Sequence, residues 1–170
     1  MIVTERLELI PVTPEIARAA IAGNTALKAV LKAEVPAGWP PLYNDPASFQ
    51  HVLDQLAKGS EQSGWWLYLV VLRAGPVLIG TVGYKGPPSS DGTVELGYGI
   101  VTEYQRKGYA TEAVKGLVSH ALAVPKVRRV IAETLPNLTP SIGVLKTCGF
   151  ELMESPGSEP GVVRFELTRP

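Results

Sequence analysis

The sequence contains one cysteine, few aromatic residues and no excess of charge of either sign. A single cysteine cannot form an internal disulfide, and no cluster of cysteines and histidines has the spacing of a zinc site. The 16 basic residues are balanced by 16 acidic ones, whereas non-specific nucleic-acid binding requires a surplus of lysine and arginine. We therefore expect no metal and no nucleic-acid partner.

Long hydrophobic runs are also missing. The longest strongly apolar run, residues 65–72, is far shorter than the roughly 20 residues that are needed to cross a membrane. Residues 1–11 carry charge early and lack the apolar stretch of a signal peptide. We expect no membrane association, a cytoplasmic location, and a monomer or a homodimer.

The chain has 170 residues, of which 45% are hydrophobic. A domain of about this length buries roughly 70% of the surface that its unfolded chain exposes, so the chain can form a substantial core. No internal repeat, low-complexity tract or interdomain linker interrupts the sequence. We expect a single domain over residues 1–170.

Hydrophobic periodicity predicts alternating strands and helices. In the second half, a strand, a long helix and a further strand form one βαβ crossover with antiparallel hairpins around it. The expected fold is an α+β or mixed α/β domain, with a mostly antiparallel central sheet and helices on both faces. The predicted strands cover residues 2–11, 65–73, 77–84, 93–101, 129–135, 150–153 and 162–167, and the predicted helices start at Pro14 and cover about 25–34, 47–58, 108–124 and 141–147.

The junction between the strand at 93–101 and the helix at 108–124 is the best candidate for anion binding. A helix N-terminus attracts phosphate, because its first N–H groups are unpaired and its dipole is positive at that end. Arg106 and Lys107 add two cations beside Gly108. We interpret this loop as a pyrophosphate site. An ordinary strand–helix turn with solvated charges is the alternative.

The strand at 93–101 carries a second chemical signal. Glu95, Gly97 and Gly99 share one face of it, because side chains alternate along a strand. Glycine is unusual in a strand unless a ligand or another backbone approaches closely. Glu95 is therefore the candidate general base, acting directly or through a water molecule. The alternative is a surface glutamate on a half-exposed strand.

Together these segments resemble the GNAT family of N-acetyltransferases. Residues 95–98, Glu-Leu-Gly-Tyr, and 105–110, Gln-Arg-Lys-Gly-Tyr-Ala, are similar to its acetyl-CoA motif. Residues 134–150 and the opening residues 4–7 are similar to the RimJ/RimL-like branch, which modifies the N-termini of ribosomal proteins. The resemblance covers nearly the whole chain and implies the GNAT-like acyl-CoA N-acyltransferase fold.

The resemblance implies that the protein transfers an acetyl group from acetyl-CoA to a primary amine by direct attack. The acceptor amine would be a peptide or protein N-terminus, a ribosomal protein among them, or a small molecule. Glu95 would be the base, and Ser141 would give the leaving thiolate a hydrogen bond; a plain helix N-cap is the alternative for Ser141. The residues expected to bind the donor are Ile100, Val101, Thr102, Gln105, Arg106, Lys107, Gly108, Tyr109, Ala110, Thr111 and Asn137.

The sequence departs from the pattern of this branch just before the predicted helix at 141–147 and within it. Leu138 stands where the branch has an asparagine that contacts CoA, and Asn137 lies one position early; Gly143 and Lys146 replace a usual arginine and glutamate. The change at Leu138 leaves a second hypothesis open, that of a non-catalytic acyl-CoA-binding or sensing module.

The proline-rich loop at 36–46 is where the family would build the wall of its acceptor pocket. We expect Trp39 and Tyr43 in this loop to contact the acceptor. Burial of these rings in the core is the alternative.

Overall fold

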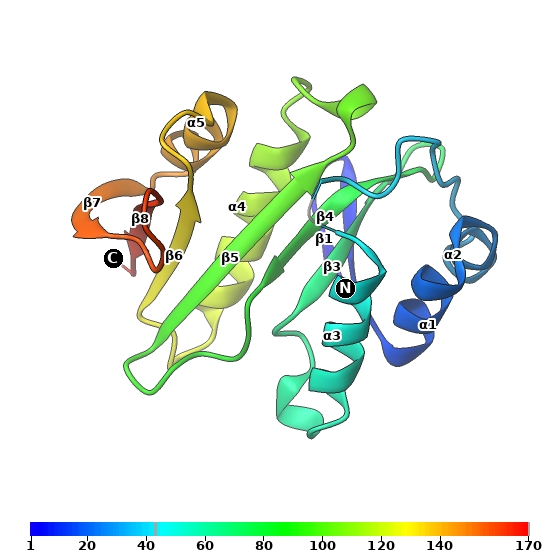
Figure 1. Ribbon diagram of the computed structural model, residues 1–170, viewed down its shortest axis with the longest axis horizontal. Helices are drawn as coiled ribbons and strands as arrows, with labels where there is room; N and C mark the ends of the chain where they lie inside the picture. Colours follow the sequence, from blue (N-terminus) through cyan, green and yellow to red (C-terminus); the bar gives the residue numbers. More distant parts are fainter. Residues whose placement is uncertain (43, 170) are drawn as a thin grey trace.

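The computed structural model describes residues 1–42 and 44–169, so the prediction for Tyr43 lies outside the described residues. Within them, one sheet is flanked by helices (Figure 1). The strands are β1 (Ile2–Val3), β2 (Leu7–Pro11), β3 (Leu67–Leu72), β4 (Leu78–Tyr84), β5 (Thr93–Ile100), β6 (Arg129–Thr134), β7 (Glu151–Pro156) and β8 (Val163–Thr168). The helices are α1 (Pro14–Ala22), α2 (Asn24–Leu31), α3 (Pro46–Leu56), α4 (Tyr109–Ala123) and α5 (Thr139–Thr147), with short 3₁₀ helices at Ser60–Gln62 and Thr102–Tyr104.

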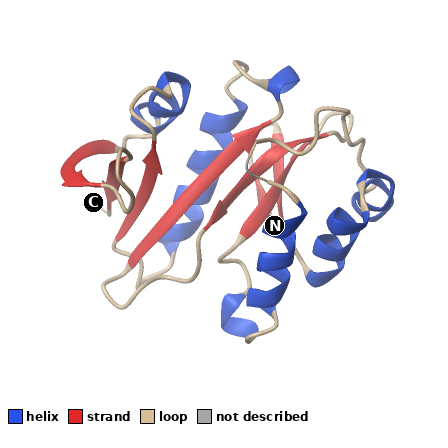
Figure 2. Cartoon of the chain, viewed as in Figure 1, coloured by secondary structure: helices blue, strands red, loops and turns tan. Residues whose placement is uncertain are grey.

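The strands lie in the order β1-β2-β3-β4-β5-β6-β8-β7. Neighbouring strands are antiparallel except β5 and β6, which are parallel and are connected through α4. The long β5 crosses the middle of the sheet with α4 behind it, and α3 lies on the opposite face of the sheet, near β3 (Figure 2). The predicted mixed sheet with one βαβ crossover and helices on both faces is therefore confirmed.

Each face of the sheet has its own hydrophobic core, because side chains alternate along the strands. Leu96 and Leu117 belong to the core under α4 and α5, which also contains Phe165 of β8. Leu69 and Phe49 belong to the second core, under α1, α2 and α3. The two cores hold β5 between a packed layer on the α4 side and a partly open layer on the α3 side.

Polar caps and prolines start two of the N-terminal helices. Thr13 Oγ1 accepts a hydrogen bond from Ile16 N at 3.2 Å, and Asp45 Oδ1 accepts one from Ser48 N at 2.9 Å. A proline follows each cap at the first helical position, where a missing N–H costs nothing. The start at Pro14 was predicted from this pattern, and the cap at Asp45 places the start of α3 one residue before the prediction.

The segment predicted as one strand over 2–11 is in fact two strands, with residues 4–6 between them. Thr4 N donates to Leu7 O at 2.9 Å and forms a turn. Arg6 N donates to Glu112 Oε1 at 2.7 Å, outside the sheet. Residues 4–6 leave the ladder because their hydrogen bonds go to this turn and to α4.

Leu117 provides a test of the core between α4 and the sheet. It is fully buried, and replacement by alanine should lower the free energy of unfolding by about 2–5 kcal/mol. Leu152 on β7 is 58% exposed, and Leu152→Ala should cost about 0.5 kcal/mol or less. Urea denaturation followed by circular dichroism measures both changes. Equal losses for the two variants would contradict this packing.

Candidate active site

The sheet opens into a wedge between β5 and β6. Pairing of the two strands begins at Thr93 and Arg129 and ends at Leu96 and Ala132. Beyond that point β5 stays paired with β4 as far as Ile100, and β6 stays paired with β8 to its own end. The two ribbons diverge toward α5 (Figure 1). The wedge is therefore framed by strands that are each held on their outer side.

The opening between β5 and β6 contains a cleft. It consists of two adjoining cavities of about 590 and about 400 Å³ that share Tyr98, Leu138 and Ser141. These volumes lie in the range of small-molecule sites. Four residues predicted to bind the donor line the larger cavity: Ile100, Val101, Thr102 and Gln105.

Backbone groups of β5 point into the wedge. The N–H of Val101 donates to Ile79 O, and Glu95 O accepts from Lys85 N, both at 2.9 Å. Odd-numbered residues of β5 thus bond toward β4. Because this direction alternates along a strand, the N–H groups of Tyr98 and Ile100 point the other way. They face the part of the wedge where β6 no longer pairs with β5.

Tyr98 and Ser141 meet across the cleft. The Tyr98 hydroxyl donates to Ser141 O at 2.9 Å and lies 3.0 Å from Ser141 Oγ. Burial raises the pKa of Tyr98 to about 12, and the hydrogen bond with Ser141 opposes this only in part, so the phenol stays neutral. The phenol has one proton: when Tyr98 gives it to Ser141 Oγ in place of Ser141 O, the serine hydroxyl proton is free for an acceptor in the cleft. This contact was not predicted, because alternation along the strand places Tyr98 on the face of the apolar residues Leu96 and Ile100.

Ser141 lies in the first turn of α5. This helix begins at Thr139, its N-cap residue is Leu138, and no side chain caps it. Ser141 is therefore not the N-cap that the alternative interpretation required. Leu138 lines both cavities, whereas Asn137 is exposed in the turn before α5 and is absent from the described lining of the cleft.

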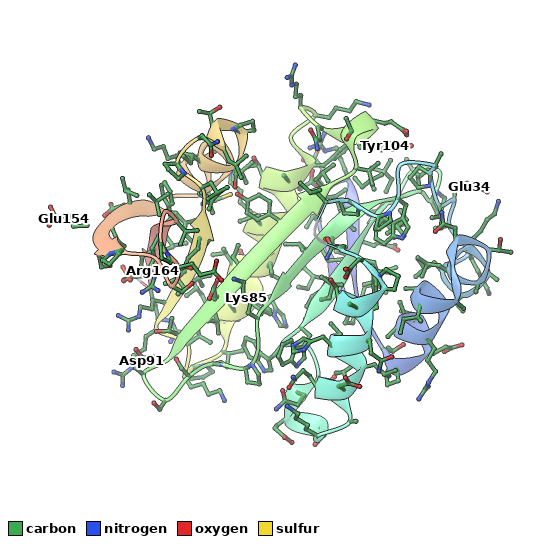
Figure 3. The ribbon with its side chains drawn as sticks, in the orientation of Figure 1. Glu34, Lys85, Asp91, Tyr104, Glu154 and Arg164 are labelled. Atoms are coloured by element: carbon green, nitrogen blue, oxygen red, sulfur yellow. The ribbon has the colours of Figure 1, made fainter. Side chains whose placement is uncertain are left out.

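Glu95 lies on the opposite face of β5 from Tyr98. Its carboxylate forms an ion pair with Lys85, which Figure 3 labels beside β5. Oε1 is buried and accepts no hydrogen bond of regular geometry from the described residues, so this ion pair is what holds it. Glu95 is absent from the described lining of the cleft, although Leu96 and Gly97 are part of it. A side chain at Gly97 would meet no atom within 4 Å, so open space lies beside Glu95.

The loop before α4 presents unpaired backbone N–H groups. Arg106 and Gly108 have positive φ angles of 60° and 79°, and this conformation turns the chain into the helix. The first intrahelical bond runs from Glu112 N to Gly108 O at 3.0 Å. The amides of residues 109–111 therefore have no acceptor within the helix, as is usual for a first turn. They lie at the N-terminus of α4, which the short loop from Gln105 joins to the end of β5.

Side chains of the same loop stabilise its shape. Gln105 Nε2 donates to Ile100 O at 2.8 Å, which ties the loop to the end of β5. Lys107 Nζ donates to Glu103 O at 3.1 Å and lies 5.2 Å from the centroid of the Tyr104 ring. Arg106 is exposed. Of the two cations predicted to face phosphate, Lys107 is already engaged by its own loop and Arg106 extends into solvent.

Trp39 lies in the core and not on the wall of the cleft. Its side chain is 8% exposed, and its ring packs against Phe49 with 6.4 Å between centroids. Burial of an indole ring among apolar side chains accounts for this position. Pro40, Pro41 and Leu42 from the same loop line the cleft instead. Trp39 is therefore absent from the described lining of the cleft, contrary to the prediction.

Glu133 of β6 is a cleft residue that sequence analysis missed. Its side chain is 6% exposed and accepts hydrogen bonds from Ser158 N at 2.9 Å and from Arg164 at 2.8 and 3.0 Å. Burial alone would raise the pKa of Glu133, but these hydrogen bonds outweigh it and hold the pKa below its ordinary value of 4.5. The contacts fix the β7–β8 hairpin to the edge of the cleft. No local motif in the sequence signals this pairing.

The described residues contain no group of three or more histidines, cysteines, aspartates or glutamates that could hold a metal ion. In residues 1–42 and 44–169, no helix has both the length and the apolar character needed to cross a bilayer.

A mixed sheet with one pair of parallel strands that are connected through a helix is the fold that the resemblance to acyl-CoA N-acyltransferases implies. The model of the acetyltransferase (GNAT) domain family matches residues 6–151. The chain belongs to this family.

Individual relatives agree with this assignment. The uncharacterized N-acetyltransferase YjdG of Bacillus subtilis is 29% identical over 97 residues, which are 57% of this chain and 58% of that protein. The chain spans about half the length of the curated relatives that it matches.

Solved structures share the fold. RimL, a ribosomal L7/L12 alpha-N-protein acetyltransferase in complex with coenzyme A, aligns with a TM-score of 0.67 and 18% identity over 98% of this chain and 96% of its own. A ribosomal-protein-S5-alanine acetyltransferase from Vibrio fischeri aligns with a TM-score of 0.66 and 20% identity over 98% of this chain and 94% of its own.

The hydrogen bonds between Glu133 and the β7–β8 hairpin can be tested through the pH dependence of the free energy of unfolding. At about pH 7, Glu133→Gln should lower the free energy of unfolding by about 1–3 kcal/mol. A carboxyl group with a lowered folded pKa stabilises above its unfolded pKa, and this stabilisation is lost as the pH falls through the folded pKa. The difference between wild type and variant should therefore shrink below about pH 4.5. Glu154→Gln, an exposed position on β7 (Figure 3), should show no such dependence in denaturant titrations over the same pH series.

Proposed function

We propose that this protein is an N-acetyltransferase that uses acetyl-CoA as donor and a primary amine as acceptor. The observation that carries the proposal is the pair of Tyr98 and Ser141 in a cleft that is also lined by the end of β5 and by Gln105, three residues before the N-cap of α4. Membership of the acetyltransferase domain family supports it, and so does the bound coenzyme A of RimL. The proposed acceptor is a peptide or protein N-terminus or a small amine.

The residues at the cleft fit such a donor. The unpaired amides of residues 109–111, next to the exposed Arg106, suit a pyrophosphate. The cavity between Ile100 and Ser141 suits a narrow chain that bears amide groups. When bound, acetyl-CoA supplies an acyl group already activated as a thioester. The inward N–H groups of Tyr98 and Ile100 would hold amide and thioester carbonyl oxygens, and a donor of this kind stabilises charge that develops on oxygen.

Glu95 and Ser141 are the two side chains that would take part in the chemistry. An amine is protonated in water and must lose a proton before it attacks. Glu95 faces the open space beside Gly97 and would take this proton through a water molecule, since the carboxylate itself lies outside the described lining of the cleft. Ser141 would donate a hydrogen bond to the departing thiolate, and Tyr98 would orient its hydroxyl group.

A non-catalytic acyl-CoA-binding or sensing module is the second candidate function. Two observations favour it. Leu138 places an apolar side chain in both cavities, at the position where the family branch has a polar one. The ion pair with Lys85 occupies the carboxylate of Glu95. In a sensor the donor would bind and no thiol would be released.

Ligand-dependent melting tests the donor site. Acetyl-CoA at about 100 times its dissociation constant should stabilise the fold by about 2.7 kcal/mol and raise the melting temperature by about 5–10 °C. CoA should act similarly and ATP weakly. Release of free thiol on addition of peptide N-termini or small amines then separates an enzyme from a sensor. Absence of any shift with acetyl-CoA would refute both functions.

Ser141→Ala tests the chemistry. Removal of the hydroxyl group should lower kcat about 10- to 100-fold, since the leaving thiolate loses a hydrogen bond worth about 1.4–2.7 kcal/mol. The KM for acetyl-CoA should change by less than about twofold, since Ser141 lies away from the proposed pyrophosphate loop. Ser119→Ala, an exposed serine on α4, is the matched control. A variant with full kcat would remove Ser141 from the mechanism.

A further inference from the structure

Arg6 forms a dense set of contacts with the loop that precedes α4. Its Nε donates to Glu112 Oε2 at 2.7 Å, and its NH1 group donates to Lys107 O at 3.0 Å. The guanidinium carbon lies 4.5 Å from the centroid of the Tyr109 ring. A side chain at Gly108 would come within 3.3 Å of NH2 of the same guanidinium. One side chain thus lies against four parts of residues 107–112: the carbonyl of Lys107, the left-handed Gly108, the ring of Tyr109 and the carboxylate of Glu112.

Glu112 of α4 holds Arg6 from the side of the helix, and we call the pair of Arg6 and Glu112 the clamp. Its Oε1 accepts hydrogen bonds from Thr4 Oγ1 at 2.6 Å and from Arg6 N at 2.7 Å. Burial would raise the pKa of Glu112, but the hydrogen bonds from Thr4 and Arg6 outweigh it, so the pKa is lowered. The carboxylate stays ionised at neutral pH and keeps all of these bonds. Its side chain is 16% exposed, which protects them in part from solvent.

The segment that carries Arg6 is itself anchored to the sheet. Arg73, which follows β3, donates from NH1 to the carbonyl oxygens of Thr4 and Glu5 at 3.0 Å each. Its backbone N–H donates to Arg6 O at 2.9 Å. At Gly116 of α4, an added side chain would come within 3.0 Å of Thr4 Cγ2. Arg6 therefore reaches the loop from a rigid base.

We propose that Arg6, held by Glu112, is a positioning residue for the donor site. It fixes the loop at 105–109 in the conformation that presents the amides of residues 109–111 to the pyrophosphate of CoA. Arg6 donates its hydrogen bonds to Glu112 and to Lys107 O. It therefore affects CoA binding through the shape of the loop and not by direct contact with CoA. The inference rests on the proposed function, since it concerns the affinity for CoA.

The contacts require a planar guanidinium. One flat group donates in two directions, to Glu112 and to Lys107 O, while its central carbon lies over the Tyr109 ring. A lysine ammonium is a point charge and cannot do both. Arg6→Lys should therefore keep the charge and lose the clamp, which separates positioning from simple electrostatic attraction to phosphate.

The test compares two donors that differ in the part that the loop would bind. Arg6→Ala and Arg6→Lys should each raise the dissociation constant of CoA and the KM of acetyl-CoA about tenfold, equivalent to about 1.4 kcal/mol. The kcat at saturating donor should stay within about twofold. With S-acetylpantetheine, which lacks the pyrophosphate, kcat/KM should be the same for wild type and variants. Arg18→Ala, an exposed arginine on α1, is the matched control.

The possible results distinguish failure of the role of Arg6 from failure of the proposed function. If wild type binds CoA and both variants bind it equally well, or if both donors lose activity equally, the clamp does not position the loop. If wild type binds no CoA, the proposed function itself fails. Because Arg6→Ala can also weaken the fold, circular dichroism and melting of Arg6→Lys, together with Glu112→Gln, keep the test decisive. In a double-mutant cycle, the combined Arg6→Lys and Glu112→Gln changes should be less than additive for CoA binding, because both remove the same contact.

Discussion

Parallel strands β5 and β6 stop exchanging hydrogen bonds after Leu96 and Ala132, while each keeps its antiparallel partner on the outer side. This divergence creates the cleft and leaves the N–H groups of Tyr98 and Ile100 without a strand partner. Buried backbone groups need hydrogen-bond partners, so the wedge is a place where water or a ligand must bind. The outer ladders hold the wedge open, so the sheet itself maintains this opening.

Much of the fold could be predicted from the sequence because its signals are local. The alternation along 93–101 and the long apolar stripe of 108–124 set the face of β5 and the extent of α4 to within a residue. The break at residues 4–6 was not predicted, since one of its two causes is the hydrogen bond from Arg6 N to Glu112, 106 residues away. A pattern in one segment contains no record of a distant hydrogen-bond partner.

In the candidate site, too, local features could be predicted and contacts between separate elements could not. The motif at 105–110 indicated a helix N-terminus with bare amides, and the structure has that geometry. Glu133 and the partnership of Tyr98 with Ser141 were not predicted, because each depends on how separate elements meet. Trp39 was expected at the acceptor, but composition alone could not tell an aromatic ring that lines a cleft from one that is buried beneath it.

The two sides of the cleft differ in construction. In the proposed function, the donor side uses backbone groups and a loop fixed by Gln105 and Arg6. The proposed acceptor side is the chain before α3 and the β7–β8 hairpin. Thr81 Oγ1 donates to Asn44 Oδ1 at 2.6 Å and holds the first segment, and Arg164 donates to Glu133 and holds the second. We expect changes in these two segments to alter the preference for the acceptor while the donor geometry stays the same.

The contact between Arg6 and Glu112 also has a consequence for synthesis on the ribosome. The two residues are 106 positions apart, so at about 5–20 residues per second Arg6 waits roughly 5–20 s for its partner to be made. During that interval the first strand segments have no helix α4 to cover them. The donor loop thus takes its final shape only after Glu112 has been synthesised, when more than half of the chain has been translated. A nascent chain that ends before Glu112 cannot contain the completed donor loop.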